Sequence, residues 1–117
     1  MDSDELQERL VDFLVEIGRV TDALPRTRFA KQISDQLVRS GTSPMANYAE
    51  ACGSESKRDL IHKLAICLKE IRESNAWLRL IIKVRLVTSN DISKLYEESD
   101  QLRRILGKSV STAKARG

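Results

Sequence analysis

A stripe of polar residues near the middle of the chain is the part of the sequence best suited to bind another molecule. Its members follow one another at steps of four, three, four and three, and they are Gln36, Ser40, Ser43, Asn47 and Glu50. On a helix this spacing keeps all five side chains on one face. An apolar row runs beside them and consists of Phe29, Ile33, Leu37, Pro44 and Tyr48. Polar groups next to a buried row must form hydrogen bonds, or else lie in a wet groove or at a subunit contact.

Arg39 and Glu73 extend the chemistry of this stripe. Arg39 can hold a carboxylate at two points, and the Asn47 amide can donate two hydrogen bonds. Two interpretations follow: a structural network between helices or subunits, or a groove that binds a ligand or a nucleic acid. The first is favoured, because each half-satisfied buried polar group costs about 1–3 kcal/mol and must be paired. We therefore expect the substitution Asn47→Leu to disturb folding or assembly.

Asp59 and His62 have the acid-x-x-His spacing found in carboxylate-bridged metal sites of helical bundles. Such a site needs the motif on two helices and two further glutamates, but His62 is the only histidine. The sequence has no glycine-rich phosphate loop, and no serine has a plausible base beside it. We therefore expect no metal, no cofactor and no catalytic residues, and a protein that is not an enzyme.

The two cysteines do not predict a zinc site. Cys52 and Cys67 lack both the CxxC spacing and a matching set of histidines, so we expect reduced, partly buried thiols. The N-terminus is acidic and unlike a signal peptide, and no apolar run approaches the ~20 residues of a membrane span. The sequence therefore predicts a soluble cytoplasmic protein with no membrane partner.

The periodicity of the apolar residues predicts the elements that position these side chains. The chain has 117 residues, of which 41% are hydrophobic and 32% charged, enough for one domain with a single core. Amphipathic helices are predicted at about 3–23, 26–52, 55–86 and 90–107, within a domain that spans residues 1–109. With short connections they predict an all-α, up-down-up-down (antiparallel) four-helix bundle. A mobile basic tail is expected over residues 108–117.

The second predicted helix crosses a Gly-Thr-Ser-Pro run that ends at Pro44. Its periodicity continues past this run, so we expect helix 2 to be kinked near Pro44, with a break into two helices as the alternative. Phe29 is expected to point inward. Gly53 is expected to end the helix in a left-handed conformation.

The third predicted helix carries more apolar surface than one subunit can bury. Besides its inner seam it has a second row that includes Ile66, Trp77, Leu80 and Val84. A helix that is apolar on more than one face is buried on more than one face. These four residues are therefore the predicted oligomer surface.

The net charge of +3 conceals an asymmetry along the chain. Residues 1–24 hold seven acids and two bases (−5), whereas residues 25–117 hold ten acids and eighteen bases (+8). The predicted nucleic-acid contacts are Lys57, Arg58, Lys63, Arg103, Arg104 and Lys108. Few aromatic residues are available to stack on bases, so we expect any such contact to be directed at shape or backbone.

The run from Gln36 to Glu50 resembles the RS-x-x-S-x-x-x-N-x-x-E signature of a bacterial four-helix bundle family that includes proteins encoded within intervening sequences of 23S rRNA genes. Glu73 falls where the family has a glutamate, and Lys69-Glu70 departs from the Gly-Ser pair of many members. The resemblance implies a homo-oligomer, a ring of five bundles, and brings no established activity. A related group acts as an accessory in retroelements that binds RNA and reverse transcriptase.

The sequence thus predicts a non-enzymatic homo-oligomer that binds structured RNA or a nucleoprotein, and the resemblance implies that it is a homopentamer. The binding surface would be a basic patch repeated in every subunit. The alternative is a protein–protein assembly module with no nucleic-acid role, which presents Trp77 and Leu80 to its partner.

Overall fold

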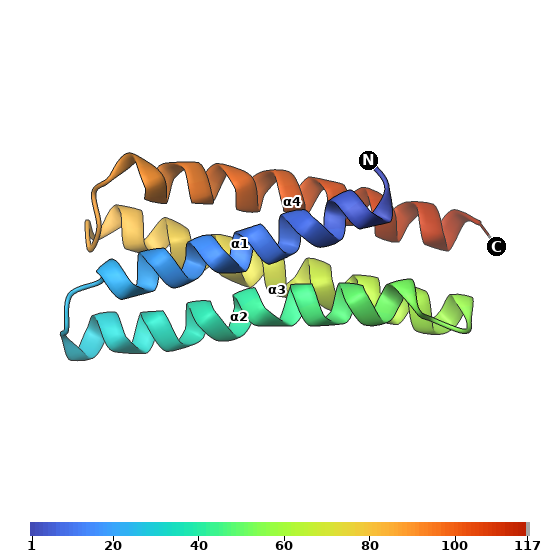
Figure 1. The fold of residues 1–117 in the computed structure, drawn as a ribbon, viewed down its shortest axis with the longest axis horizontal. Helices are drawn as coiled ribbons and strands as arrows, with labels where there is room; N and C mark the ends of the chain where they lie inside the picture. Colours follow the sequence, from blue (N-terminus) through green and yellow to red (C-terminus); the bar gives the residue numbers. More distant parts are fainter. Residues whose placement is uncertain (117) are drawn as a thin grey trace.

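Four helices make up the fold in the computed structural model, which describes residues 1–116. They are α1 (Ser3–Ala23), α2 (Arg28–Cys52), α3 (Lys57–Lys83) and α4 (Asn90–Ala115). Figure 1 shows each helix running in the direction opposite to the one before it. The α1–α2 and α3–α4 connections lie at one end, and the α2–α3 connection and both termini at the other. No strand occurs in the described residues, and the predicted all-α four-helix bundle is confirmed.

Side-chain caps and a proline set several of the helix ends. Asp2, Thr27 and Ser56 each accept a hydrogen bond from the backbone N–H three residues further on, at 2.9, 3.2 and 3.0 Å. Such caps satisfy one of the N–H groups that the first turn of a helix leaves free. α1 stops before Leu24 because that residue is extended (φ −69°, ψ 147°), as the proline after it requires.

The core is a single apolar cluster formed by one stripe of each helix. α2 and α3 pack against each other most extensively, and α1 and α4 least. Gly41 lies where α2 approaches α1, and a Cβ added there would meet Ile17 Cδ1 at 2.3 Å. None of the helices in residues 1–116 is long and apolar enough to cross a membrane.

α2 is not divided at Pro44. The helix runs without interruption through Pro44, so the alternative of two separate helices is wrong. Ser40, Gly41 and Pro44 are all buried. This packing against the neighbouring helices outweighs the hydrogen bond that proline cannot form. The kink near Pro44 stays a prediction.

Two other local predictions in α2 are wrong. Phe29 is 54% exposed, and Ala30, which is fully buried, takes the inward position instead, because the buried register of α2 passes through residue 30. Gly53 follows α2 with φ −100°, not in the left-handed region. Its N–H donates to the Glu50 carbonyl at 3.1 Å, a tight turn that needs no positive φ.

α4 continues past Gly107 to residue 115. The predicted helix end at residue 107 and the predicted mobile tail over residues 108–115 are therefore wrong, while residue 117 lies outside the described part of the chain. Val110 is 8% exposed and Ala113 packs against the core. These apolar contacts outweigh the weak helix propensity of one glycine.

Candidate functional site

The polar stripe of α2 lies in the seam between α2 and α3. Ser40 is fully buried there, and its hydroxyl accepts a hydrogen bond of 2.8 Å from the hydroxyl of Ser74, which is also fully buried. Ser40 in turn donates to the Leu37 carbonyl at 3.2 Å. Two small side chains allow the helices to approach closely, and their hydrogen bonds offset the loss of water. This part of the stripe is a packing contact.

Arg39 holds two carboxylates of α3. Its guanidinium donates to Glu70 at 3.2 Å, to Gln36 at 3.3 Å and, at shorter range, to Glu73. Glu73 also accepts a hydrogen bond of 3.0 Å from the indole N–H of Trp77. The Glu70 side chain is only 11% exposed, so it needs the positive charge of Arg39 beside it. We call these five residues the Arg39 network.

The other residues of the stripe also have partners within the chain. Asn47 donates to the backbone and side-chain oxygens of Ser43, both at 3.0 Å. Glu50 accepts a hydrogen bond of 3.0 Å from Lys63 of α3. In the part of the chain that the structure describes, no buried side-chain nitrogen or oxygen lacks a hydrogen-bond partner. The geometry therefore favours a structural network over a ligand groove at this stripe.

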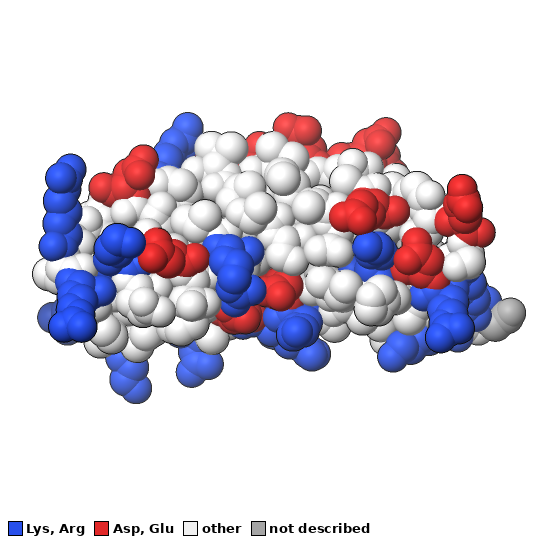
Figure 2. Space-filling view, turned by 90° about the horizontal axis from the view of Figure 1, so that it is seen from below, with Lys and Arg blue, Asp and Glu red and all other residues white. Residues whose placement is uncertain are grey.

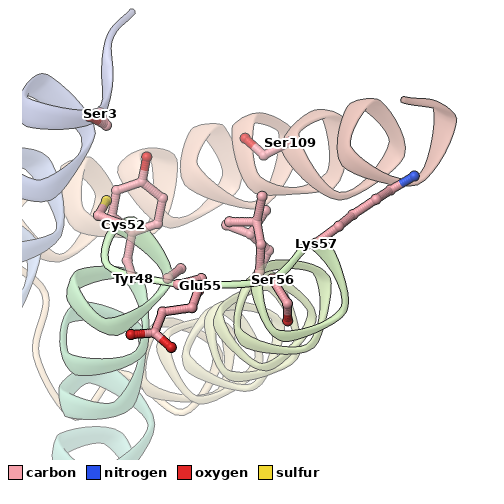
Figure 3. Close-up of a pocket in the computed structure, with 11 residues that line it drawn as sticks. Ser3, Tyr48, Cys52, Glu55, Ser56, Lys57 and Ser109 are labelled. Atoms are coloured by element: carbon pink, nitrogen blue, oxygen red, sulfur yellow. The ribbon is translucent and has the colours of Figure 1, made fainter. Parts of the chain in front are cut away.

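A groove of about 570 Å³ opens at the end of the bundle where α2 meets α3. In Figure 3, Tyr48 and Cys52 line it from α2, Ser56 and Lys57 lie at the start of α3, and Ser109 faces them from α4. Burial raises the pKa of Tyr48 to about 12, so its hydroxyl stays protonated near neutral pH. The Ser56 hydroxyl is engaged as the cap of α3. The groove offers polar contacts, but neither hydroxyl is activated as a nucleophile.

Asp59 and His62 are exposed on the first turns of α3, beside Ser56. Among residues 1–116, no group of three or more His, Cys, Asp or Glu side chains is placed to hold a metal ion. Cys52 is exposed and Cys67 is buried, and both are free thiols. Burial raises the pKa of Cys67 to about 12, so this thiol is inert at neutral pH.

The outward face of α3 carries a row of cations. Positions at alternating steps of four and three along this face are all exposed, and they are Arg58, His62, Ala65, Lys69, Arg72, Ala76, Arg79 and Lys83. Five of these eight residues are Lys or Arg, and none is acidic. We call the five the α3 cationic row. None of them forms an ion pair with another described residue.

Charge is distributed unevenly between the helices. α1 holds six acids and two bases, whereas α3 holds three acids and seven bases. Two of the three acids of α3 pair with Arg39, so the outer surface of this helix is more basic than its composition indicates. On the face shown in Figure 2, Lys and Arg gather along the lower edge and at both ends, while most Asp and Glu lie in the middle and toward the upper edge.

The six predicted nucleic-acid contacts differ in whether they form ion pairs, and two of them, Lys57 and Lys108, line one groove between α3 and α4. On α4, Arg103 and Arg104 both pair with Asp100, at 2.7 and 2.9 Å, and the hydrogen bond from Arg103 lowers the pKa of that carboxyl. Lys63 pairs with Glu50. Those that are exposed and form no ion pair within residues 1–116 are Lys57, Arg58 and Lys108.

The basic residues of the α3 cationic row are evident in the sequence, but the predicted nucleic-acid contacts include only Arg58 from it. The alternating steps of four and three are visible in the sequence and are the signal that finds the other four members. Glu70 was missed as a partner of Arg39. Its spacing of three from Glu73, on the same helical row, is the corresponding signal.

The predicted oligomer surface is partly covered within one subunit. Trp77 and Leu80 are half-buried and pack against the core. Ile66 is also half-buried, whereas Val84 is 45% exposed. The most exposed part of this surface therefore lies at the C-terminal end of α3.

Phe29 adds to this apolar surface, although the sequence predicted that its side chain points into the core. The Ser40–Ser74 contact fixes the antiparallel register of α2 and α3, and this register brings Phe29 level with Val84. Both side chains are about half exposed, at 54% and 45%. An apolar patch thus spans the two helices near the α1–α2 and α3–α4 connections.

Comparison with known proteins relates these features to a family. The family model described as 23S rRNA-intervening sequence protein matches residues 4–108, which include the Arg39 network and the whole α3 cationic row. The chain is also 30% identical to a protein with unknown function from the S23 ribosomal protein family from Bacteroides thetaiotaomicron VPI-5482, known from a crystal structure. That similarity covers 90% of this chain and 97% of that chain, with a TM-score of 0.82. No curated protein matches the chain.

Proposed function

The chain belongs to the 23S rRNA-intervening sequence protein family, and from this premise we propose that it is a cytoplasmic RNA-binding protein, not an enzyme. The α3 cationic row is the observation that carries the proposal. Its five cations have no acidic partner among the described residues, and they follow one exposed face from Arg58 to Lys83. At a rise of about 1.5 Å per residue this face is roughly 38 Å long.

A row of cations without acids lowers the stability of the free protein. Like charges three or four residues apart repel, and the row contains such pairs in Lys69 with Arg72 and Arg79 with Lys83. A solvated helix face usually alternates acids and bases, which removes this repulsion. A bound polyanion removes it as well, because each phosphate neutralises a cation and releases counterions.

The composition of the row favours structured RNA over single strands. The only aromatic ring on the face that carries it is His62, so this face offers little surface on which unpaired bases can stack. Ala65 and Ala76 interrupt the long side chains and leave the helix surface open to a nucleic-acid backbone. Double-stranded RNA is bound mainly through its shape, phosphates and 2′-hydroxyls, and these are the contacts that Lys and Arg supply.

Charge reversal on two helices tests the proposal. We expect Arg72→Glu with Arg79→Glu to weaken binding of a labelled RNA hairpin at least tenfold, with the melting temperature unchanged or raised. The matched control is Arg103→Glu with Arg104→Glu, the same change of charge on α4, where Asp100 already pairs with both arginines. A much smaller loss is expected from the control. Equal losses from both pairs, or none from the α3 pair, would contradict the proposal.

We also propose that copies of the chain associate, as a ring of five, through the predicted oligomer surface of Ile66, Trp77, Leu80 and Val84 together with Phe29. Exposure of Phe29 and Val84 at one level of the α2–α3 seam supports this. Burying such a patch stabilises an assembly by about 25 cal/mol per Å². Each subunit would then repeat the cationic row around the ring.

The assembly proposal has its own test. Light scattering of the purified chain is expected to give a mass several times 13.2 kDa. Val84→Lys combined with Phe29→Lys is expected to reduce the mass to that of one subunit while the helical content is kept. A monomeric wild-type protein would overturn the proposed assembly.

A further inference from the structure

Arg85 has an unusual backbone conformation at the end of α3. Its φ is 55°, and it is the only non-glycine residue with a positive φ in the described part of the chain. α3 accordingly ends at Lys83, three residues before the predicted end at residue 86. The N–H of Arg85 donates to the Ile82 carbonyl at 3.2 Å and the N–H of Leu86 to the Ile81 carbonyl at 3.1 Å. These two bonds define a Schellman motif, in which this position is usually glycine.

An arginine at this position destabilises the free protein relative to glycine. A Cβ in the left-handed region lies too close to the following carbonyl oxygen, a clash that glycine avoids. The Arg85 side chain is exposed and forms no hydrogen bond or ion pair that would offset this clash within residues 1–116. When no side-chain contact within the chain offsets the backbone strain of a residue, the strain points to a role in binding another molecule.

The position of Arg85 indicates what that role is. It follows Lys83, the last member of the α3 cationic row, by two residues. The register of α2 against α3, fixed by the Ser40–Ser74 contact, brings the exposed Arg28 level with Arg85. Figure 2 shows Lys and Arg gathered at this end of the molecule, on the left of the view.

We infer that Arg85 binds a phosphate group of RNA, so that the bound backbone continues from the α3 cationic row over the α3–α4 connection toward Arg28. This inference rests on the proposed RNA-binding function and extends its surface around the end of the bundle. An arginine occupies this left-handed position, where glycine is usually preferred, because its guanidinium contributes to binding. Stability and binding therefore oppose each other at Arg85.

Arg85→Gly separates the two effects because it is expected to move them in opposite directions. The melting temperature should rise by about 4 °C, since glycine removes the backbone clash. Affinity for a labelled RNA hairpin with a stem of about 16 base pairs should fall roughly fivefold at 0.1 M salt. The slope of log K against log salt should become less steep by about 0.9, the loss of one phosphate contact.

Two further variants serve as controls. Arg85→Lys keeps the positive charge and also keeps a Cβ in the left-handed backbone conformation. It is expected to keep most of the affinity, with no rise in melting temperature. Arg116→Gly removes an arginine at the end of another helix, where φ is −80°, so no stabilisation is expected. A rise in melting temperature with Arg116→Gly equal to that with Arg85→Gly would overturn the argument from strain.

The outcome for Arg85 is distinguishable from the outcome for the proposed function. If Arg85→Gly keeps full affinity and salt slope while Arg72→Glu with Arg79→Glu loses affinity, Arg85 is not a contact and the inference fails alone. If neither change affects RNA affinity, the RNA-binding function itself fails. A loss of affinity without a rise in melting temperature would overturn the opposition between stability and binding.

Discussion

Two faces of α3 carry charge in opposite ways. On the face toward α2, Glu70 and Glu73 both pair with Arg39, and Glu73 also accepts a hydrogen bond from the indole N–H of Trp77. On the outward face, the five cations of the α3 cationic row have no acidic partner in residues 1–116. Charges paired inside the chain contribute to the fold, whereas unpaired like charges on one exposed face lower its stability slightly. Substitutions on the two faces should therefore change different properties.

The largest effect on stability is expected from Arg39→Leu. This change leaves the nearly buried Glu70 carboxylate without its counter-charge, and should lower the free energy of unfolding by about 2 kcal/mol. The loss is smaller than for a fully buried pair because the Arg39 side chain is 50% exposed. Arg72→Leu on the outward face is the matched control and should change stability by less than ~0.5 kcal/mol. Equal losses in urea denaturation would show that the two faces do not differ.

A double substitution sharpens this result. If the cost of Arg39→Leu comes from the stranded carboxylate, adding Glu70→Leu should recover more than half of the lost stability. The coupling between the two positions should then be about 1–2 kcal/mol in a double-mutant cycle. Additive losses, with no recovery in the double variant, would show that Glu70 does not depend on Arg39.

Asn47→Leu should have a smaller effect than Arg39→Leu. Both hydrogen bonds of the Asn47 amide go to Ser43 on the same helix, so they do not hold α2 against α3. We expect a loss of about 1 kcal/mol or less in the free energy of unfolding. An unchanged melting temperature and an unchanged oligomer size would refute the prediction from the sequence that this residue matters for folding or assembly.

Cys67, on the inner side of α3, should make the stability of the fold depend on pH in alkaline solution. Burial raises the pKa of Cys67 from the ordinary value of 9.0 to about 12, so the unfolded chain loses this proton first as the pH rises. Stability is therefore fully present below pH 9 and is lost progressively between about pH 9 and 12. Cys67→Ala should remove this part of the alkaline transition. A thiol reagent at pH 8 should modify the exposed Cys52 and spare Cys67, and modification of both in the native protein would contradict the burial.

The sequence was sufficient for the fold because each helix has a long apolar stripe with a clear period. The sequence was less informative at the ends of the helices, where a few side-chain contacts determine how far a helix extends and which residues it buries. Val110 and Ala113 carry α4 beyond Gly107, and a one-residue shift of register exposes Phe29 and buries Ala30. Such outcomes depend on neighbouring helices, which no local pattern contains.

The site illustrates the same limit. The spacing of the α3 cationic row is visible in the sequence, but the distinction between paired and unpaired cations depends on the register of the bundle. Arg39 reaches Glu70 because α2 and α3 are antiparallel in one particular register. Only with such pairs assigned do the unpaired cations of α3 stand out from the rest of the basic surface.

The salt dependence of RNA binding distinguishes the outward face of α3 from the rest of the basic surface. With a labelled RNA hairpin, the five cations of the row should contribute about −4.5 to the wild-type slope of log K against log salt, or 0.9 for each cation. Arg72→Ala with Arg79→Ala should make it less steep by about 1.8, whereas Arg103→Ala with Arg104→Ala should leave it unchanged. One common slope for all three proteins, or a shallower slope only for the α4 pair, would contradict the assignment of the outward face of α3 to RNA.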